Sequence, residues 1–461
     1  MKAILKRTKM GGVRELFTLA LPIVISQSSE TLMVFTDRVF LSRLGADNMN
    51  AATAGGITSF MLITFFFGLI GFSTALIAQY FGSKNYENCP RVTVQALGIS
   101  TLAYPIILAC IPLVFWFFSS TVVSESQLVL QKQYLKILAF GSIISLFRHT
   151  ISCYFSGIGR TQVVMISALV TLSVNVVVNY ILIFGKLGIP ALGIEGAAYG
   201  TIFSALCGLV VLLYYFFRND NARQFLVHKA FRFHAHITKT LFRYGSPAGV
   251  EFFGNLVAFS VLVSIFHSYN EVTATAASIM FNWDMVTFVP LTGIEVGVTS
   301  LVGRYIGANR YYVAERSAYS GVKLGFFFSL FVAIMFVAIP GVLVDVFKPI
   351  GEDPVFLQSR PLAMTMLQLA AIYVLAESIL VAFVGALRGA GDTMWTMWAS
   401  MILHWLFVPA LYLSLFVFDI GPVKAWGILV VFFLCFSFMF YFRFKGGAWK
   451  RISVIEHNHD M

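Results

Sequence analysis

Charged residues are scarce in this chain of 461 residues. Asp, Glu, Lys and Arg occupy 11% of positions and hydrophobic residues 58%, whereas a soluble domain carries about 25% charged residues. The apolar residues come in runs of about 20 or more, which is the length that crosses a bilayer as a helix. A β-barrel would instead show stretches of about ten residues with alternating polarity. The sequence therefore predicts an all-α polytopic membrane protein.

Several chemical motifs are missing as well. The five cysteines are scattered and form no Cys-x-x-Cys pair, so they indicate neither a disulfide nor a metal framework. The chain lacks a Gly-x-x-x-x-Gly-Lys-Ser/Thr loop, so ATP is not expected as the direct fuel. We find no catalytic constellation and no link long enough for a soluble domain. We therefore predict a protein that is not an enzyme and has no cofactor.

The apolar runs predict twelve membrane spans. Their expected ranges are 15–40, 57–81, 93–118, 134–157, 162–185, 194–217, 246–268, 272–302, 318–343, 362–387, 393–417 and 424–443. They divide the chain into an N-lobe (1–217), a linker (218–245), a C-lobe (246–443) and a tail (444–461). The linker alternates basic residues with phenylalanines, which favours an amphipathic helix on the inner leaflet.

Positive charge gathers on one side of this predicted topology. With twelve spans, 22 of the 32 Lys and Arg residues fall on the side of the two termini. Positive residues stay cytoplasmic, so both termini are expected in the cytoplasm and the chain in the cytoplasmic (inner) membrane. The net charge of +11 is thereby explained by topology and lipid headgroups, with no nucleic-acid partner. We expect a monomer in the lipid bilayer.

The two halves of the chain share landmarks in the same order. Pro22 and Pro247 open the first and seventh spans, and Gly82 and Gly307 end the second and eighth, both 225 residues apart. Six spans per half is an even number, so both halves run the same way through the membrane. This predicts two six-helix bundles related by a pseudo-two-fold axis along the membrane normal, with a cleft between them.

The first span contains unusual residues for a membrane helix. Ser26, Glu30 and Asp37 share one helical face. An acid at mid-membrane costs roughly 2.5–3.5 kcal/mol, which about twenty apolar neighbours can offset. Such an acid can exchange a proton or bind a cation; the alternative for Asp37 is an interfacial pair with an arginine. Pro22 leaves a carbonyl free and predicts a hinge, with a static kink as the alternative.

Polar side chains also interrupt the fifth and sixth spans. Asn175 and Asn179 lie one turn apart among valines, and Thr201 lies in the next span. Amide oxygens at this spacing can share a cation with a carboxylate or hold its proton. The alternative is that they only tie helices together, as Asn often does in membrane bundles.

The second half carries four acids within its spans. Glu251 and Asn255 share one face of the seventh span, and Asp284 and Glu295 one face of the eighth, while Glu377 lies near the middle of the tenth. With few buried bases expected nearby, these acids predict a water-filled, negatively biased cavity that suits cationic cargo. We assign its lining to Glu30, Glu251, Asn255, Asp284 and Glu295.

Four segments carry a resemblance to a known family. In order along the chain, they are Leu19-Ala20-Leu21-Pro22 with Asp37, Ala78-Gln79-Tyr80-Phe81-Gly82, Asn175 and Asn179 before Gly193-Ile194-Glu195-Gly196-Ala197-Ala198, and Leu387-Arg388-Gly389-Ala390-Gly391-Asp392-Thr393. Together with twelve spans, they resemble the bacterial multidrug and toxic compound extrusion (MATE) transporters. The resemblance covers nearly the whole chain and includes features of the NorM-type branch.

The resemblance implies a function and roles for several residues. MATE transporters export organic cations and drugs in exchange for H⁺ or Na⁺ by rocking between outward-open and inward-open states. Asp37 matches the coupling aspartate of the first helix, and Glu377 matches the C-lobe acid of the NorM-type branch. Asn175, Asn179 and Thr201 match the N-lobe ion cluster, where Na⁺ would contact Asp37 and the two amides. The NorM-type branch has an acid at the position of Asn255, whereas this chain has Glu251 one turn earlier.

We therefore predict a secondary active multidrug efflux transporter that exchanges lipophilic organic cations for H⁺ or Na⁺. A flippase of lipid-linked glycans is the nearest alternative, but its cleft should carry buried arginines for pyrophosphate. A membrane-embedded transferase is the alternative from another class, and it would need the catalytic constellation that the sequence lacks.

Overall fold

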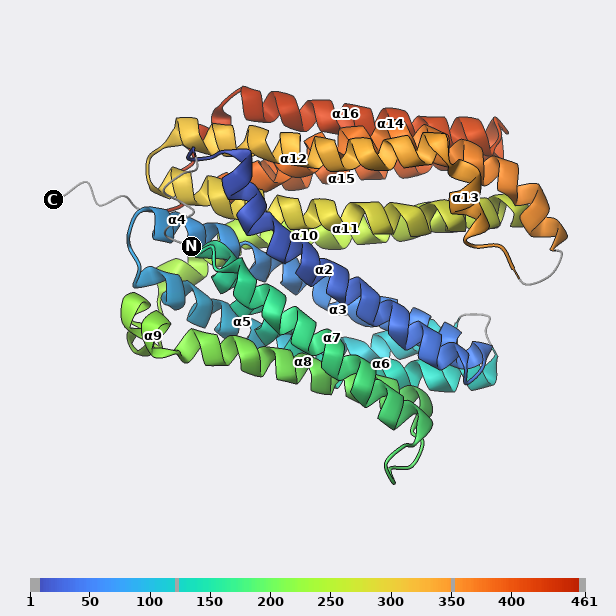
Figure 1. Ribbon diagram of the computed structural model, residues 1–461, viewed down its shortest axis with the longest axis horizontal. Coiled ribbons are helices and arrows are strands. Elements are labelled where there is room, and N and C mark those ends of the chain that lie inside the picture. Colours follow the sequence, from blue (N-terminus) through green and yellow to red (C-terminus); the bar gives the residue numbers. More distant parts are fainter. Residues whose placement is uncertain (1–8, 121–123, 350–352, 456–461) are drawn as a thin grey trace. The chain divides into compact units, whose positions relative to one another are not determined.

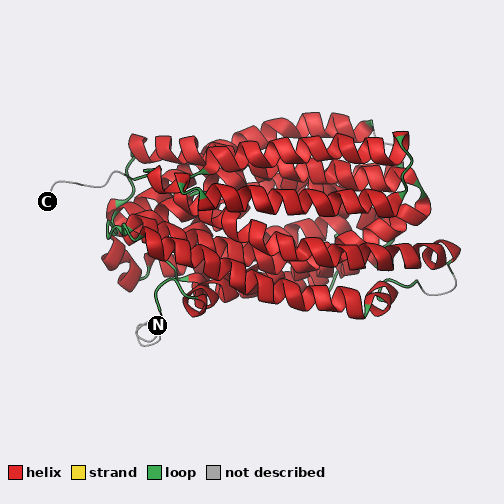
Figure 2. Cartoon of the chain, turned by 90° about the horizontal axis from the view of Figure 1, so that it is seen from above, coloured by secondary structure: helices red, strands yellow, loops and turns green. Residues whose placement is uncertain are grey.

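The structure, a computed structural model, describes residues 9–120, 124–349 and 353–455. These residues are helical apart from short connections, and no strand occurs among them (Figures 1 and 2). A helix satisfies its backbone hydrogen bonds internally, which lipid requires because it offers no partners. Twelve candidate spans are present in the described part of the chain, so the predicted all-α polytopic fold is confirmed.

The elements follow one another with short connections. In chain order they are α2 (Val13–Ser42), α3 (Ala46–Gly71), α4 (Ser73–Gly82), α5 (Asn88–Ser119), α6 (Glu125–Gly157), α7 (Thr161–Phe184), α8 (Gly193–Phe217), α9 (Asn219–Phe225), η1 (Val227–Lys229), α10 (Ala235–Tyr269), α11 (Glu271–Gly307), α12 (Tyr311–Ala338), α13 (Pro340–Asp345), α14 (Pro354–Ala390), α15 (Thr393–Tyr412), η2 (Leu413–Val417), α16 (Pro422–Lys445) and η3 (Ala448–Arg451). Helices α3 and α4 together make one span, as do α15 and η2.

Several helices begin before the apolar runs that predicted them. Helix α14 begins at Pro354, eight residues before the expected start of its span. There the Asp353 carboxylate accepts hydrogen bonds from the backbone N–H groups of Val355 and Phe356, at 2.9 and 3.3 Å. Such a cap satisfies donors that would otherwise lack partners. Helix ends are therefore set by caps as well as by hydropathy.

The chain divides into two compact units. Unit 1 contains residues 1–24, 251–306 and 310–453, and unit 2 contains residues 25–250, 307–309 and 454–461. The boundaries fall inside α2, two residues after Pro22, and inside α10, three residues after Pro247. The first part of each of these long helices thus belongs to one unit and the rest to the other.

Each unit is built around one central helix. In unit 2, α6 packs against α3, α4, α5, α7 and α8. In unit 1, α14 packs against α12, α13, α15 and α16, and 78% of its most apolar window is buried, the highest share of the twelve spans. These are the fourth and tenth spans, so the central helices occupy equivalent places in the two halves.

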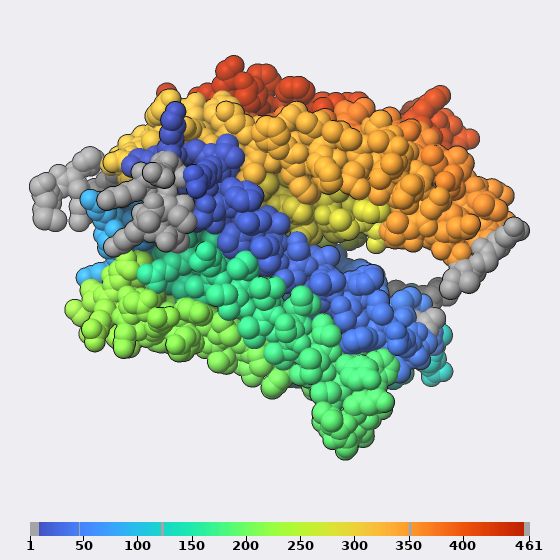
Figure 3. Space-filling view, viewed as in Figure 1, coloured from blue at the N-terminus to red at the C-terminus, as the bar shows by residue number. Residues whose placement is uncertain are grey.

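The outer faces of the helices are apolar. Trp116 is 69% exposed and Leu102 67% on α5, and Phe331 is 62% exposed on α12. Large apolar side chains of this kind face lipid when a helix bundle lies in a membrane. The connection between α7 and α8, residues 185–192, extends past the helix ends as a green projection in Figure 3, and its Leu187 is 85% exposed.

The linker differs from the predicted amphipathic surface helix. After α8 ends at Phe217, it forms only the seven-residue α9 and the short η1 before α10 begins at Ala235. Phe225 is 1% exposed and packs against Tyr154 with ring centroids 5.9 Å apart. The amphipathic interpretation was wrong for Phe225, whose ring is buried inside unit 2, whereas Phe231 and Phe242 are 54% and 44% exposed.

The described part of the tail is also packed. Trp449 is fully buried, donates from Nε1 to the carbonyl of Phe444 at 2.8 Å, and stacks on that ring. Residues 456–461 of the predicted tail lie outside the described residues.

The burial of Phe225 in unit 2 can be tested by mutation. Phe225→Ala should lower the melting temperature of the purified protein, because truncating a buried Phe costs about 3–5 kcal/mol in protein cores. Phe231→Ala is the matched control, since Phe231 lies in the same linker but is 54% exposed. Equal melting temperatures for the two variants would contradict the burial of Phe225.

Candidate ion and cargo sites

Unit 2 buries an acid among polar side chains from three helices. Asp37 on α2 is 7% exposed. Its Oδ1 accepts a hydrogen bond from Asn179 Nδ2 on α7 at 2.5 Å, and its Oδ2 accepts one from Thr201 Oγ1 on α8 at 3.3 Å. The structure thus brings together Asp37, Asn179 and Thr201, which sequence reasoning grouped from separate spans.

The positions of Asn175 and Asn179 near Asp37 follow from the geometry of helices α7 and α8. Asn175 and Asn179 lie four residues apart on α7, which puts them on one face, and both are fully buried. Gly200 on α8 lies directly against Asn179, and a Cβ at that position would overlap Asn179 Oδ1. Glycine therefore leaves the space in which the amide turns toward Asp37, a role that sequence reasoning did not assign.

Three buried amide atoms in this cluster lack hydrogen-bond partners among the described residues. They are Oδ1 and Nδ2 of Asn175 and Oδ1 of Asn179. A buried polar atom without a partner is costly, and such atoms often mark a missing ligand. Carboxylate, amide and hydroxyl oxygens are the donors that hard cations prefer. The residues present therefore fit a hard monovalent cation such as Na⁺, and the Asp37 carboxylate can equally hold a proton.

Glu30 lies on the same helix but has a different partner. Its Oε1 pairs with Arg148 Nη2 on α6 at 2.9 Å. Next to Arg148, His149 stacks on Phe67 with ring centroids 4.4 Å apart and contacts the thiol of Cys153, Sγ to Nε2, at 3.7 Å. Arg148 and His149 therefore tie helices within unit 2, and Glu30 is a neutralised acid in this structure.

An arginine joins two of the predicted cargo acids in unit 1. Arg388 on α14 pairs through Nη2 with Glu251 on α10 at 3.1 Å and through Nη1 with Glu295 on α11 at 2.5 Å. Thr396 on α15 also donates to Glu251 at 3.2 Å. The expectation that few buried bases lie near these acids was wrong for Glu251 and Glu295. The error arose because Arg388 was expected at the end of its span, on the cytoplasmic side, and not beside these acids.

Asp284 and Glu377, the other two acids predicted within the spans of unit 1, form a second group. Tyr373 donates its hydroxyl to Asp284 Oδ1 at 2.8 Å, and it precedes Glu377 by one turn on α14. Glu377 is 3% exposed, and its Oε2 has no hydrogen-bond partner among the described residues. A buried carboxyl with a free oxygen is suited to hold a proton or a cation. The i, i+4 spacing of Tyr373 and Glu377 was the signal that could have found the tyrosine.

Asn255 lies with a third set of partners. Its Oδ1 accepts a hydrogen bond from Ser400 on α15 at 2.9 Å, and Ser400 is followed one turn later by His404. The predicted lining residues are thus distributed over separate groups of contacts. Glu30 belongs to unit 2, while Glu251 with Glu295, Asp284 and Asn255 form three groups within unit 1.

Comparison with known proteins gives the family. The family model described as MatE matches residues 22–181 and 247–413, so the same model matches both halves and begins at the two prolines that revealed the repeat. The chain belongs to the MatE family. Members of this family are transporters, so the protein is a multi-pass membrane transporter and not an enzyme.

Relatives of this chain extend over nearly its whole length. It is 28% identical over 426 residues to the probable multidrug resistance protein NorM of Oceanobacillus iheyensis, covering 89% of this chain and 91% of the relative. It is 26% identical over 402 residues to the multidrug resistance protein PmpM of Pseudomonas aeruginosa, covering 85% and 82%.

Solved structures share the fold. A MOP superfamily transporter from Pyrococcus furiosus matches with a TM-score of 0.87 at 19% identity, covering 96% of this chain and 98% of that one. An outward-facing multidrug resistance MATE family transporter matches with a TM-score of 0.84 at 19% identity, covering 96% and 97%.

The unpartnered amide of Asn175 generates a test. Asn175→Leu should raise the melting temperature in ion-free buffer at high pH, because it removes buried unsatisfied groups that cost about 1–3 kcal/mol each. It should also abolish the rise in melting temperature that Na⁺ gives the wild type, because the variant lacks the amide oxygen that would bind this ion and a ligand stabilises only the state it binds.

Ser329→Ala is the control for this test. Ser329 Oγ in unit 1 is likewise buried without a partner among the described residues, so its removal should leave the ion-dependent rise intact. If Asn175→Leu keeps the full ion-dependent rise, Asn175 has no part in ion binding.

Proposed function

We propose that this protein is a secondary active multidrug efflux transporter that exports lipophilic organic cations in exchange for H⁺ or Na⁺. The observation that carries the proposal is the buried Asp37 carboxylate beside the side-chain amide of Asn175 and the Oδ1 atom of Asn179, which have no hydrogen-bond partner among the described residues. This cluster can bind one H⁺ or Na⁺ ion and release it again in each transport cycle. The names of the curated relatives, which are multidrug resistance proteins, support drugs as the cargo.

The proposed cycle runs by alternating access. An ion from outside binds at Asp37, moves inward with the change of state, and is released before a cargo cation is taken up. Each positive charge that moves inward gains roughly 2.3 kcal/mol per 100 mV of membrane potential. Glu377, with its unpartnered oxygen, is the second acid that we assign to ion coupling, and Asp284 favours positive charge in the cargo.

Pro22 is the proposed hinge. It lies inside the continuous helix α2, and the boundary between the two compact units falls two residues later. Proline removes one backbone hydrogen bond, so bending there disrupts less of the helix than bending elsewhere. A bend at this point would change the direction of the segment that carries Asp37.

The proposed setting is the cytoplasmic membrane, with a monomer whose two termini face the cytoplasm. The support is the excess of Lys and Arg in the loops on the side of the termini, because positive loops are retained in the cytoplasm. A flippase of lipid-linked glycans is less well supported. Arg148 and Arg388, which could serve a pyrophosphate, are each paired with carboxylates.

Efflux from vesicles tests the proposal. Wild-type protein should drive efflux of a fluorescent lipophilic cation when an H⁺ or Na⁺ gradient is imposed, and a swap of K⁺ for Na⁺ at fixed pH identifies the ion. Asp37→Asn should reduce gradient-driven efflux to the level of protein-free vesicles, because the amide neither takes a proton nor carries the charge that binds Na⁺.

Glu87→Gln is the control, since Glu87 is an exposed acid paired with Arg91 in the same unit. Efflux that ignores both gradients would refute the coupling, and undiminished gradient-driven efflux by Asp37→Asn would refute the role of that residue.

A further inference from the structure

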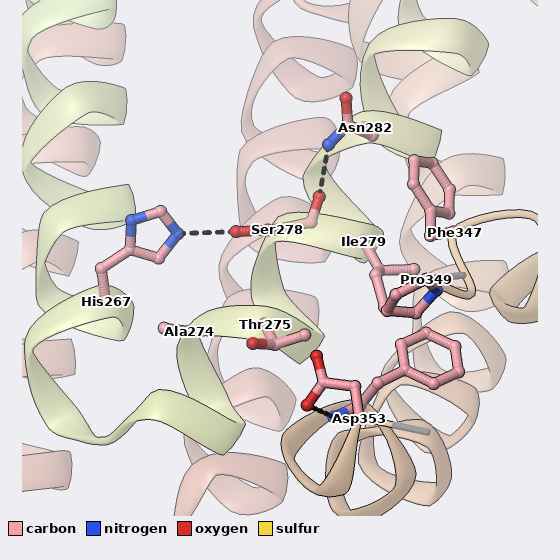
Figure 4. Close-up of a pocket in the computed structure, with 10 residues that line it drawn as sticks. His267, Ala274, Thr275, Ser278, Ile279, Asn282, Phe347, Pro349 and Asp353 are labelled. Atoms are coloured by element: carbon pink, nitrogen blue, oxygen red, sulfur yellow. Dashed lines mark hydrogen bonds between the residues drawn. The ribbon is translucent and has the colours of Figure 1, made fainter. Parts of the chain in front are cut away.

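Unit 1 contains a cavity that the ion and cargo groups do not use. Its volume is about 300 Å³. It lies between the end of α10, the start of α11 and four residues that follow α13 or begin α14, namely Phe347, Pro349, Asp353 and Phe356 (Figure 4). Its lining combines an acid, aromatic rings and small polar side chains, which together can recognise a ligand that has both an apolar and a charged part.

The acid in the cavity is Asp353. Its Oδ1 caps α14 by accepting from the backbone N–H groups of Val355 and Phe356. Figure 4 shows its second oxygen directed into the cavity near Thr275, and no hydrogen bond of that oxygen is found among the described residues. One end of the carboxylate is thus fixed by the helix, which holds the other end toward the cavity.

Aromatic rings form the wall beside this acid. Phe347 and Phe356 both line the cavity. Trp283 packs edge-on against Phe347, with ring centroids 6.3 Å apart, and donates from Nε1 to the carbonyl of Leu343 at 3.0 Å. Phe347 is therefore held in place, and aromatic faces attract cations through their quadrupole.

An ion pair joins the end of α13 to α14. Arg360 donates from Nε and Nη2 to the two oxygens of Asp345, at 2.7 and 2.8 Å. The hydrogen bond from Arg360 holds the pKa of the Asp345 carboxyl below its usual value. Two parallel hydrogen bonds define geometry better than one, so the end of α13 is held against α14.

The opposite side of the cavity supplies small polar groups. His267 Nε2 contacts Ser278 Oγ at 2.9 Å and so links α10 to α11. Asn282 donates from Nδ2 to the Ser278 carbonyl at 2.8 Å, and its side chain lies above this pair in Figure 4. Hydroxyl and amide oxygens here are suitable acceptors for N–H groups of a ligand.

We propose that this cavity binds a small aromatic ammonium ion. The carboxylate of Asp353 would neutralise its charge, the rings of Phe347 and Phe356 would pack on its aromatic part, and the hydroxyl of Thr275 would accept an N–H hydrogen bond. A cavity of about 150 Å³ holds benzene, so one of 300 Å³ has room for one or two rings. Such a mixture of apolar walls and a few directed polar groups is typical of small-molecule sites.

This site goes beyond the proposed transport function and does not require it. Only its accessibility rests on the proposed topology, which places the connection between α10 and α11 on the outer side. Binding is measured on purified full-length protein in detergent, so failure of transport and failure of this site are distinguishable.

The test follows fluorine NMR signals of the seven tryptophans in protein labelled with fluorotryptophan. Trp283→Phe identifies the Trp283 signal. Titration with naphthylmethylammonium should move that signal saturably. Asp353→Asn should weaken binding up to about fivefold and leave binding of the neutral naphthylmethanol unchanged, because Asn caps a helix as well as Asp does.

Glu271→Gln is the matched control, since Glu271 lies at the start of α11 and does not line the cavity; its affinity for the ammonium should equal that of the wild type. If Asp353→Asn does not fold, Phe347→Leu takes its place and should also weaken binding of the ammonium. An unresponsive Trp283 signal, or equal affinity of the wild type and the variant used, would overturn the proposal.

Discussion

The rest of the structure depends on the buried carboxylate of Asp37, because some of the polar atoms around it lack hydrogen-bond partners among the described residues. Asp37 has two hydrogen-bond donors, but three other amide atoms of Asn175 and Asn179 have no partner among the described residues. A fully satisfied acid would be a static structural element, and an unsupported one would resist burial. An ion can complete this partial set of contacts, and its release restores the original state. A transport cycle can use this difference between the ion-bound and the ion-free state of the Asp37 cluster.

The two units are alike in their frame and different in their chemistry. Each has a central helix in the equivalent place, α6 or α14, and each half matches the same family model. Unit 2 concentrates its polar groups around Asp37, whereas unit 1 divides its acids between Arg388 and Tyr373. Glu251 and Glu295 share Arg388, so removing this arginine would leave two largely buried carboxylates without their basic partner. Duplication thus preserved the packing while the buried charges diverged.

The sequence predicted the fold well because membrane helices are encoded locally. Each apolar run predicts one membrane helix without reference to the rest of the chain, and twelve candidate spans are found among the described residues. The Asp37 cluster was predictable for a similar reason, since Asn175 and Asn179 share a helical face and their family resemblance supplied the partner. The pairing of Arg388 was not predictable, because Glu251 and Glu295 lie on other helices far away in the chain. The prediction for Phe225 in the linker was wrong because a phenylalanine among basic residues can face either the lipid leaflet or a protein core. Only the tertiary contacts of Phe225 place its ring inside unit 2.

The most direct test of the central claim is the number of ions that the purified protein takes up. Binding of radioactive sodium and uptake of protons should be measured on the same samples of wild type and Asp37→Asn, without cargo and without a membrane potential. The account predicts saturable uptake of Na⁺ or H⁺ by the wild type, competition between these ions, and loss of the site in the variant. Equal uptake by the two proteins would show that Asp37 is not the ion site.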